Sequence, residues 1–399
     1  MAAIRQQRFG LVLSGGGARG AYEAGVARYL ACNLAPKIGG LPFRIACGTS
    51  IGAAQVAWLA GHGFSSASAR RLSAIWQTLT TDQVFHFEAM DLLKSPAQLF
   101  RRGRQRAGSS LVDPRPMHRL IRSLFPAKGL RRRLSSGALT ALSVSTTRVS
   151  DGLSVRFVDH SEQEWRAYHS PPTVSVRGAR ITADHVLASA AIPFIFPPVA
   201  VDGSFYVDGS LRQNTPLTPA LRLGSERILV LGCKAPFQPA PEPEGTDEQT
   251  PNLFYLLGKA LDALMLDPVS QDLDRVEAMN RMLDWGTRTY GPDFIDRMNA
   301  DLTPAAGHPY RLVRTHLVHP REDLGRVAAA AFRTGEASLN RATRMLLSTI
   351  AAREGEEDAD LLSYLLFDRT YTGELERLGW EDARDSEAEL VRFFTDVDA

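Results

Sequence analysis

A glycine-rich stretch near the N-terminus, LVLSGGGARGAYEAG at residues 11–25, constrains the fold more than any other part of the sequence. An apolar run over residues 9–13 precedes it, and apolar residues at helical spacing follow it. This pattern predicts a strand, a tight loop and a helix. Gly15, Gly17 and Gly20 also satisfy G-x-G-x-x-G, the fingerprint of dinucleotide-binding loops. The loop therefore holds either a phosphate group or the oxyanion of a reacting ester.

The residues that follow this loop argue against a nucleotide. A dinucleotide site needs an acidic residue about 20 positions beyond its glycine loop, but the chain has no Asp or Glu between Glu23 and Asp82. The Gly-Lys-Ser/Thr sequence of a Walker phosphate-binding loop does not follow either. We therefore expect no cofactor of the nucleotide type.

A second motif, CGTSIGA at residues 47–53, contains Gly48-x-Ser50-x-Gly52. A strand predicted over 43–47 enters this motif and a helix predicted over 51–60 leaves it, which is the context of a nucleophile elbow. Glycine at both flanking positions allows a sharp turn from which the Ser50 hydroxyl projects. The alternative is an ordinary strand-to-helix turn with a chance G-x-S-x-G.

A serine that attacks an ester creates a negative oxygen, which needs hydrogen-bond donors already in place. The backbone N–H groups of Gly16 and Gly17 suit this role, because they precede a helix and carry no side chains that hinder access. Arg19 is expected either to add positive charge or to brace the loop. The glycine loop is thus better explained as an oxyanion hole than as a phosphate site.

Ser50 also needs a proton acceptor, and the residues alone leave two kinds open. Asp208 lies where a predicted strand gives way to a loop, although a plain turn explains Asp208–Gly209 as well. The earlier pair Asp202–Gly203 is predicted to be a hairpin turn. The other candidates are three histidines that follow in the chain order of a hydrolase triad, namely His308, His316 and His319.

Four stretches in the same order resemble the patatin-like phospholipase family and together span about residues 9–221: the glycine loop 14–20, the elbow 48–52, ASAAIPFIFPP at 188–198, and Asp208–Gly209. The resemblance implies a Ser–Asp dyad without histidine that acts on acyl esters of lipids. It assigns Ser50 as nucleophile and Asp208 as base. It assigns the oxyanion loop to Gly15, Gly16, Gly17 and Arg19, and the elbow glycines to Gly48 and Gly52. The family usually has Gly or Ala two residues after the aspartate, whereas this chain has Ser210.

Three functions are compatible with these motifs. The first is a serine lipid acyl hydrolase that forms an acyl-enzyme on phospholipids, lysophospholipids or other acyl lipids. The second is a transacylase that uses the same dyad and passes the acyl group to an alcohol or a carrier. The third is a catalytically silent membrane-binding module. Within the family-like region, IPFIFPP at residues 192–198 is expected either to line an acyl channel or to pack in the core.

Strand and helix patterns alternate along the first part of the chain. They predict an α/β fold with three α/β/α layers, a mostly parallel central sheet and a largely helical C-terminal region. We expect a catalytic domain over 1–237 with a helical, basic insertion over 63–138. A linker is predicted over 238–251, followed by a mainly helical region over 252–399, in which residues 310–318 alternate like a further strand of the sheet.

Composition narrows the partners. A formal net charge of +2 over 399 residues gives no field that indicates nucleic acid. The three cysteines and the acidic residues show no metal-ligand spacing. No run reaches the ~18 apolar residues of a membrane span, so we expect a cytoplasmic protein. Arginines cluster locally, either as a solvated face or as a peripheral contact with anionic membranes: Arg101, Arg102, Arg104, Arg106, Arg131, Arg132 and Arg133.

Overall fold

The structure is a computed structural model. It describes residues 7–86, 112–162, 165, 167–193, 195–234, 269–302, 309–334, 343–345, 347–348 and 359–396. The linker predicted over 238–251 lies outside these residues. The same holds for His308 and for the arginines Arg101, Arg102, Arg104 and Arg106.

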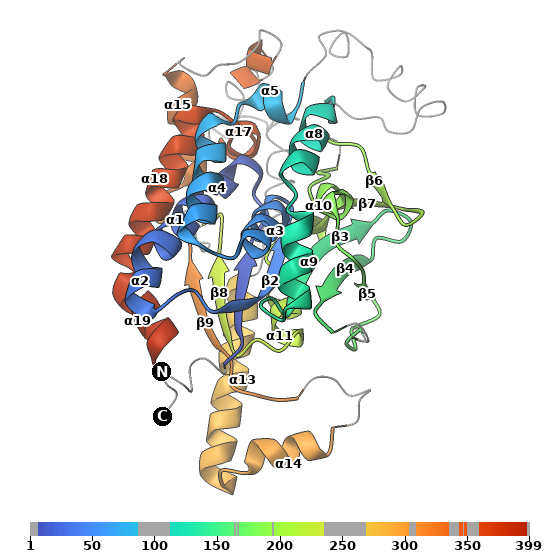
Figure 1. Cartoon of the computed structure of the whole chain (residues 1–399), viewed down its shortest axis with the longest axis vertical. Coiled ribbons are helices and arrows are strands. Elements are labelled where there is room, and N and C mark those ends of the chain that lie inside the picture. The colour runs from blue at the N-terminus through green and yellow to red at the C-terminus, as the bar shows by residue number, and fades with distance from the viewer. Residues whose placement is uncertain are drawn as a thin grey trace, which may run out of the picture.

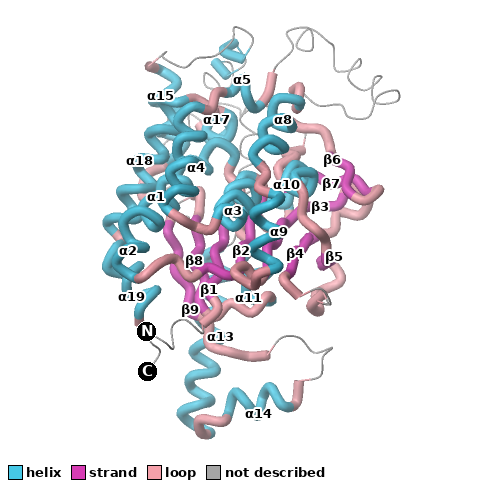
Figure 2. Tube along the Cα trace, in the orientation of Figure 1, coloured by secondary structure: helices cyan, strands magenta, loops and turns pink. Residues whose placement is uncertain are grey.

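The described strands form one sheet with a parallel centre (Figure 2). β1, β2, β3, β8 and β9 run in one direction, whereas β4 runs antiparallel to β3. β6 and β7 form a hairpin, and β7 also pairs with β3. The order across the sheet is β5-β4-β3-β2-β1-β8-β9. The bounds are β1 Phe9–Leu13, β2 Phe43–Thr49, β3 Ala141–Arg148, β4 Ser154–His160, β5 Val174–Gly178, β6 Val199–Val201, β7 Ser204–Asp208, β8 Arg227–Leu231 and β9 Arg314–Val318.

Helices connect and cover these strands (Figure 1). In the part of the chain before residue 235 they are α1 Gly20–Tyr29, α2 Ala35–Ile38, α3 Ile51–His62, α4 Ser66–Thr78, α5 Thr81–Val84, α8 Arg115–Leu124, α9 Ala127–Ser135, α10 Ala183–Ser189 and α11 Leu217–Arg222. Short 3₁₀-helices lie at Gly17–Arg19 and Gly209–Leu211, and a π-helical turn lies at Leu30–Leu34. Those that follow are α13 Val269–Tyr290, α14 Phe294–Ala300, α15 Leu324–Arg333, α17 Asp360–Leu365, α18 Arg369–Asp385 and α19 Glu387–Thr395.

The apolar core has two parts because successive side chains of a strand point to opposite faces of the sheet. On one face, Leu11 and Leu13 of β1 pack with residues from α1, α3, α10 and α18. On the other face, Val12 of the same strand packs with α11, and Val276 of α13 joins this group. The predicted fold, a mostly parallel sheet between two helical layers with a helical C-terminal region, is confirmed.

The C-terminal helix α18 packs directly against α1 in the N-terminal part of the chain (Figure 1). A Cβ atom on Gly25 of α1 would lie 2.0 Å from the backbone oxygen of Glu376, and one on Gly379 of α18 would lie 2.0 Å from that of Tyr22. Two helices come this close only where a residue at the crossing has no side chain. The C-terminal helices are therefore built into the same body as the glycine loop.

The basic residues at 131–133 are less available than the membrane hypothesis requires. Arg131 forms a salt bridge with Asp159, and Arg133 donates to the backbone oxygen of Ala138 and lies over the Phe64 ring. Only Arg132 of the three is exposed. Both engaged arginines thus have contacts within the chain, and the peripheral membrane contact stays a prediction. None of the described helices is long and apolar enough to cross a membrane.

The close approach of α1 and α18 makes two glycines of one helix respond in opposite ways to alanine. We expect Gly379→Ala to lower the free energy of unfolding by roughly 1–3 kcal/mol, because its methyl group meets backbone. Gly373→Ala is the matched control, since no atom lies within 4 Å of its added Cβ, and alanine should raise stability by up to about 1 kcal/mol. Urea unfolding followed by circular dichroism measures both changes. Equal effects of the two substitutions would contradict this packing.

Candidate active site

Ser50 stands at a sharp turn between β2 and α3. Its φ of 55° and ψ of −126° lie in a region that costs a residue other than glycine about 1–3 kcal/mol. A Cβ on Gly48 would lie 2.5 Å from the Gly52 oxygen, and one on Gly52 would lie 2.4 Å from the Ser14 oxygen. Both glycines are thus required by contact with backbone. This local geometry is that of the nucleophile elbow expected from the sequence.

Asp208 ends β7, and the sheet brings it to Ser50 across 158 residues. Thr49 at the end of β2 pairs with Ser145 of β3, and the next residue of β3, Thr146, pairs with Asp208. The Ser50 hydroxyl donates to Asp208 Oδ2 at 2.7 Å. Strand register therefore joins the two residues that the sequence motifs singled out separately.

Asp208 is fully buried, and its environment holds the carboxyl group in one orientation. Its Oδ1 accepts a hydrogen bond of 2.8 Å from the backbone N–H of Ser210. Burial raises the pKa of Asp208 from 3.8 to about 6, while the hydrogen bonds from Ser50 and Ser210 act in the opposite direction. A carboxylate with such a pKa is ionised at neutral pH and is a stronger base than an exposed one.

A short segment at the end of α10 supports both residues and was not singled out for this role in the sequence. The hydroxyl of Ser189 accepts a hydrogen bond of 2.8 Å from the Ser50 N–H and donates to the Ser145 oxygen. Two residues later, the backbone oxygen of Ala191 accepts from the Asp208 N–H at 2.9 Å. The signal in the sequence was the family-like stretch 188–198, which contains both residues.

Three apolar residues further along that stretch belong to the core. Ile192, Ile195 and Phe196 are buried among other apolar residues. For these three residues the burial fits the packing alternative.

The glycine loop lies directly beside Ser50. A Cβ on Gly15 would lie 3.1 Å from the Ser50 Cβ. The Gly15 N–H itself donates to the Asn214 oxygen, and the Arg19 N–H donates to the Gly16 oxygen. Among the described residues, the N–H groups of Gly16 and Gly17 have no hydrogen-bond acceptor. Of the three loop glycines, Gly16 and Gly17 therefore stay the candidate donors, whereas the Gly15 N–H is already engaged.

The side chain of Arg19 is held by contacts with the C-terminal part of the chain. It is almost fully buried, and its guanidinium bonds to Asp360, Ser363 and Tyr364 of α17. Of the two roles considered for Arg19, the structure therefore favours bracing of the loop.

Glu23 supports the start of the glycine loop from beneath. It is fully buried, accepts 2.8 Å and 2.9 Å hydrogen bonds from the Ser14 N–H and the Gln55 side chain, and lies beside Cys233. Burial raises its pKa well above the usual range. Glu23 thus ties α1 and α3 to the loop between them.

The two described histidines of the alternative triad form no hydrogen bond with Ser50. His316 is on β9, three strands from β2 in the sheet order, which corresponds to about 14 Å. His319 bonds to the Pro320 oxygen. No described histidine is hydrogen-bonded to Ser50 or Asp208. The geometry supports aspartate rather than histidine as the partner of Ser50.

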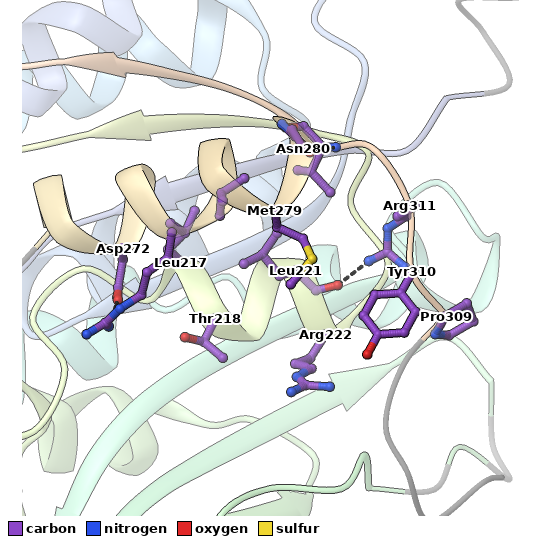
Figure 3. A pocket seen from close by; sticks show the side chains of 13 residues that line it. Leu217, Thr218, Leu221, Arg222, Asp272, Met279, Asn280, Pro309, Tyr310 and Arg311 are labelled. Carbon is purple, nitrogen blue, oxygen red and sulfur yellow. Dashed lines mark hydrogen bonds and ion pairs between the residues drawn. The ribbon is translucent and has the colours of Figure 1, made fainter. Parts of the chain in front are cut away.

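Two cavities bear on ligand binding. A narrow one of about 70 Å³ lies between α3, α4 and α8, and its lining includes Ile51, the residue after Ser50, together with Trp58, Leu72 and Ile121. A cavity of about 380 Å³ lies between α11, α13 and residues 309–313 (Figure 3). Its lining includes neither Ser50 nor Asp208. Among the described residues, no group of His, Cys, Asp and Glu side chains is arranged to hold a metal ion.

Comparison with known proteins agrees with these motifs. A family model described as patatin-like phospholipase matches residues 11–221, which is more than half of the chain. The chain belongs to the patatin-like phospholipase family. This is a family of lipid acyl hydrolases, and the matched residues contain the glycine loop, the elbow and Asp208.

Other comparisons add little. No curated protein matched the chain. Among solved structures, VipD from Legionella pneumophila is 14% identical and covers 93% of this chain and 67% of its own, with a TM-score of 0.35. A likeness this low does not bear on the site.

The raised pKa of Asp208 predicts that its ionised carboxylate lowers the stability of the native state. Above about pH 6 the carboxylate is ionised in the native and unfolded states, so its burial penalty is fully present; below pH 3.8 it is protonated in both. We expect Asp208→Asn to unfold at a higher temperature than wild type at pH 7.5, with the difference shrinking toward pH 4.5. The matched control is Asp202→Asn in the exposed β6–β7 turn. Scanning calorimetry at several pH values measures this, and a pH-independent difference would contradict it.

Proposed function

We propose that this protein is a serine hydrolase that cleaves carboxylic esters of phospholipids, lysophospholipids or related acyl lipids. The observation that carries the proposal is the 2.7 Å hydrogen bond from Ser50 to a buried carboxylate, Asp208, within a family of lipid acyl hydrolases. In this proposal Ser50 is the nucleophile and Asp208 is the general base.

The reaction has two steps with Asp208 as proton carrier. Asp208 Oδ2 takes the proton of Ser50 while Oγ bonds to the ester carbonyl carbon. The tetrahedral intermediate then expels the alcohol, which takes the proton back from Asp208. Water attacks the resulting acyl-enzyme and gives its proton to Asp208. The fatty acid leaves as Ser50 recovers its proton.

The negative oxygen of each intermediate needs donors that are already oriented. The unpaired N–H groups of Gly16 and Gly17, on the loop beside Ser50, supply them in this mechanism. Loss of one such donor costs on the order of 10²–10³ in kcat in serine hydrolases. The loop must therefore hold both N–H groups in a fixed orientation.

The apolar cavity that Ile51 helps to line supports an acyl substrate. Its lining comes mainly from four helices, α3, α4, α8 and α10, and is almost entirely aliphatic and aromatic, with Gln55 as the polar exception. Ile51 is the residue directly after Ser50, so the cavity lies on the same helix that starts at the nucleophile. Burial of each methylene contributes about 0.8 kcal/mol, so this cavity supports binding of chains rather than of polar groups.

Labelling with a fluorophosphonate tests the nucleophile and its base together. We expect an adduct on Ser50 by peptide mapping, none in Ser50→Ala, and labelling slowed by about 10²–10⁴ in Asp208→Asn because the base is lost. His308→Ala, His316→Ala and His319→Ala are the control variants and should label like wild type. Loss of labelling in one of them would favour the histidine triad.

If wild type gives no adduct in detergent or on liposomes, the elbow is inert or needs an activator, and the result favours the catalytically silent membrane-binding module. If it labels, product analysis with and without an added alcohol acceptor separates the hydrolase from a transacylase with the same dyad.

The pKa of Asp208 predicts the pH dependence of turnover. Only the carboxylate accepts the Ser50 proton, so kcat/KM should rise with pH and be half-maximal at about pH 6. An uncharged short-chain nitrophenyl ester is the substrate of choice, because its own charge does not change in this range. A profile that is flat from pH 5 to pH 8 would rule out Asp208 as the base.

A further inference from the structure

We propose that helix α17, which lies far beyond the family-matched residues 11–221, completes the active site. Asp360, Ser363 and Tyr364 position Arg19 and thereby fix the glycine loop whose N–H groups bind the oxyanion. This inference rests on the proposed function for its effect on turnover, but the contact itself does not depend on it.

The contacts to Arg19 come from one turn and a half of α17. Arg19 NH2 forms an ion pair of 2.8 Å with Asp360 Oδ1, and its Nε donates to the Ser363 hydroxyl at 2.7 Å. NH1 donates to the Tyr364 hydroxyl at 3.2 Å, and the guanidinium lies 4.2 Å from the centre of the Tyr364 ring. Each of the three guanidinium nitrogens thus has a hydrogen-bond partner on α17.

The burial of the Arg19 guanidinium makes these contacts necessary for a stable fold. Arg19 is only 2% exposed, and a buried charge is tolerated only where a counter-charge and acceptors are in place. Asp360 supplies the counter-charge. The Ser363 hydroxyl is itself oriented, because it donates a hydrogen bond to the backbone oxygen of Asp360. The side chain of Arg19 therefore has one stable position, and that position is set by α17.

The backbone of α17 also touches the loop. Gly17 has a φ of +55°, and a Cβ atom there would lie 2.4 Å from the backbone oxygen of Tyr364. Gly17 is one of the two residues proposed to bind the oxyanion. Since the Arg19 N–H closes the loop onto the Gly16 oxygen, movement of Arg19 or Tyr364 would displace both donors.

The helix is itself anchored, so it can act as a rigid support. Immediately after α17, the Phe367 oxygen accepts a hydrogen bond from Thr81, and the Phe367 ring stacks on Trp76 of α4. Thr372 of α18 donates to the Trp76 oxygen. Contacts from two parts of the chain thus hold the segment that holds Arg19.

The test compares the full-length wild type with Asp360→Ala, Asp360→Asn and a matched control. Glu376→Ala breaks another ion pair, that of the partly buried Arg28 on α1 with the buried Glu376 on α18, and neither residue belongs to the glycine loop. Hydrogen exchange by mass spectrometry on peptides covering residues 13–22 reports on the loop directly. Steady-state hydrolysis gives kcat and KM, and thermal unfolding gives the stability of each variant.

We expect faster exchange over residues 13–22 in Asp360→Ala, and a kcat lowered by roughly ten- to a hundredfold with KM within about twofold of wild type, as for a misplaced catalytic group. Asp360→Asn keeps an acceptor for Arg19 and should recover part of kcat. Glu376→Ala should lose stability but keep kcat and the exchange of this loop close to wild type.

Unchanged exchange in Asp360→Ala, or equal changes in Glu376→Ala, would overturn the positioning role. Faster exchange with unchanged kcat in an active enzyme would overturn it too. Absence of Ser50-dependent turnover in wild type would instead contradict the proposed function, and hydrogen exchange would still decide whether α17 holds the loop.

Discussion

The sharp turn at Ser50 is the constraint on which the rest of the site depends. Its positive φ is strained for a serine, and the strain persists because β2 and α3 fix the chain on both sides. Gly48 and Gly52 allow this turn, since each meets backbone atoms where a side chain would stand. The hydroxyl is thereby held at the end of the parallel strands, where the sheet brings its partner.

Strand pairing within the sheet places the proposed base beside this serine. Asp208 arrives on β7, which pairs antiparallel with β3, and β3 pairs with β2. Ser189 and Ala191 then hold the backbones of both residues from one short segment. With Asp208 buried and its pKa raised to about 6, the arrangement favours proton transfer at neutral pH without histidine.

The glycine loop connects this site to the C-terminal part of the chain. Glu23 of α1 and Gln55 of α3 support the loop by hydrogen bonds. Arg19, at the end of the loop, forms an ion pair with Asp360 of α17. The close crossing of α1 and α18 through Gly25 and Gly379 brings these distant segments into one body. The shape of an oxyanion site can thus depend on helices that lie outside the matched family residues.

The sequence by itself determined the local features, because each depends on a few neighbouring residues. The β1–loop–α1 unit, the elbow at Ser50 and the Asp202–Gly203 hairpin could be predicted from glycine positions and apolar spacing. The motifs also singled out Ser50 and Asp208. Only the tertiary structure decided that aspartate rather than histidine meets the serine, that Arg19 turns toward Asp360, and that β5 joins the sheet. Strand register and helix crossings join residues more than a hundred positions apart, and no local pattern encodes which distant partners will meet.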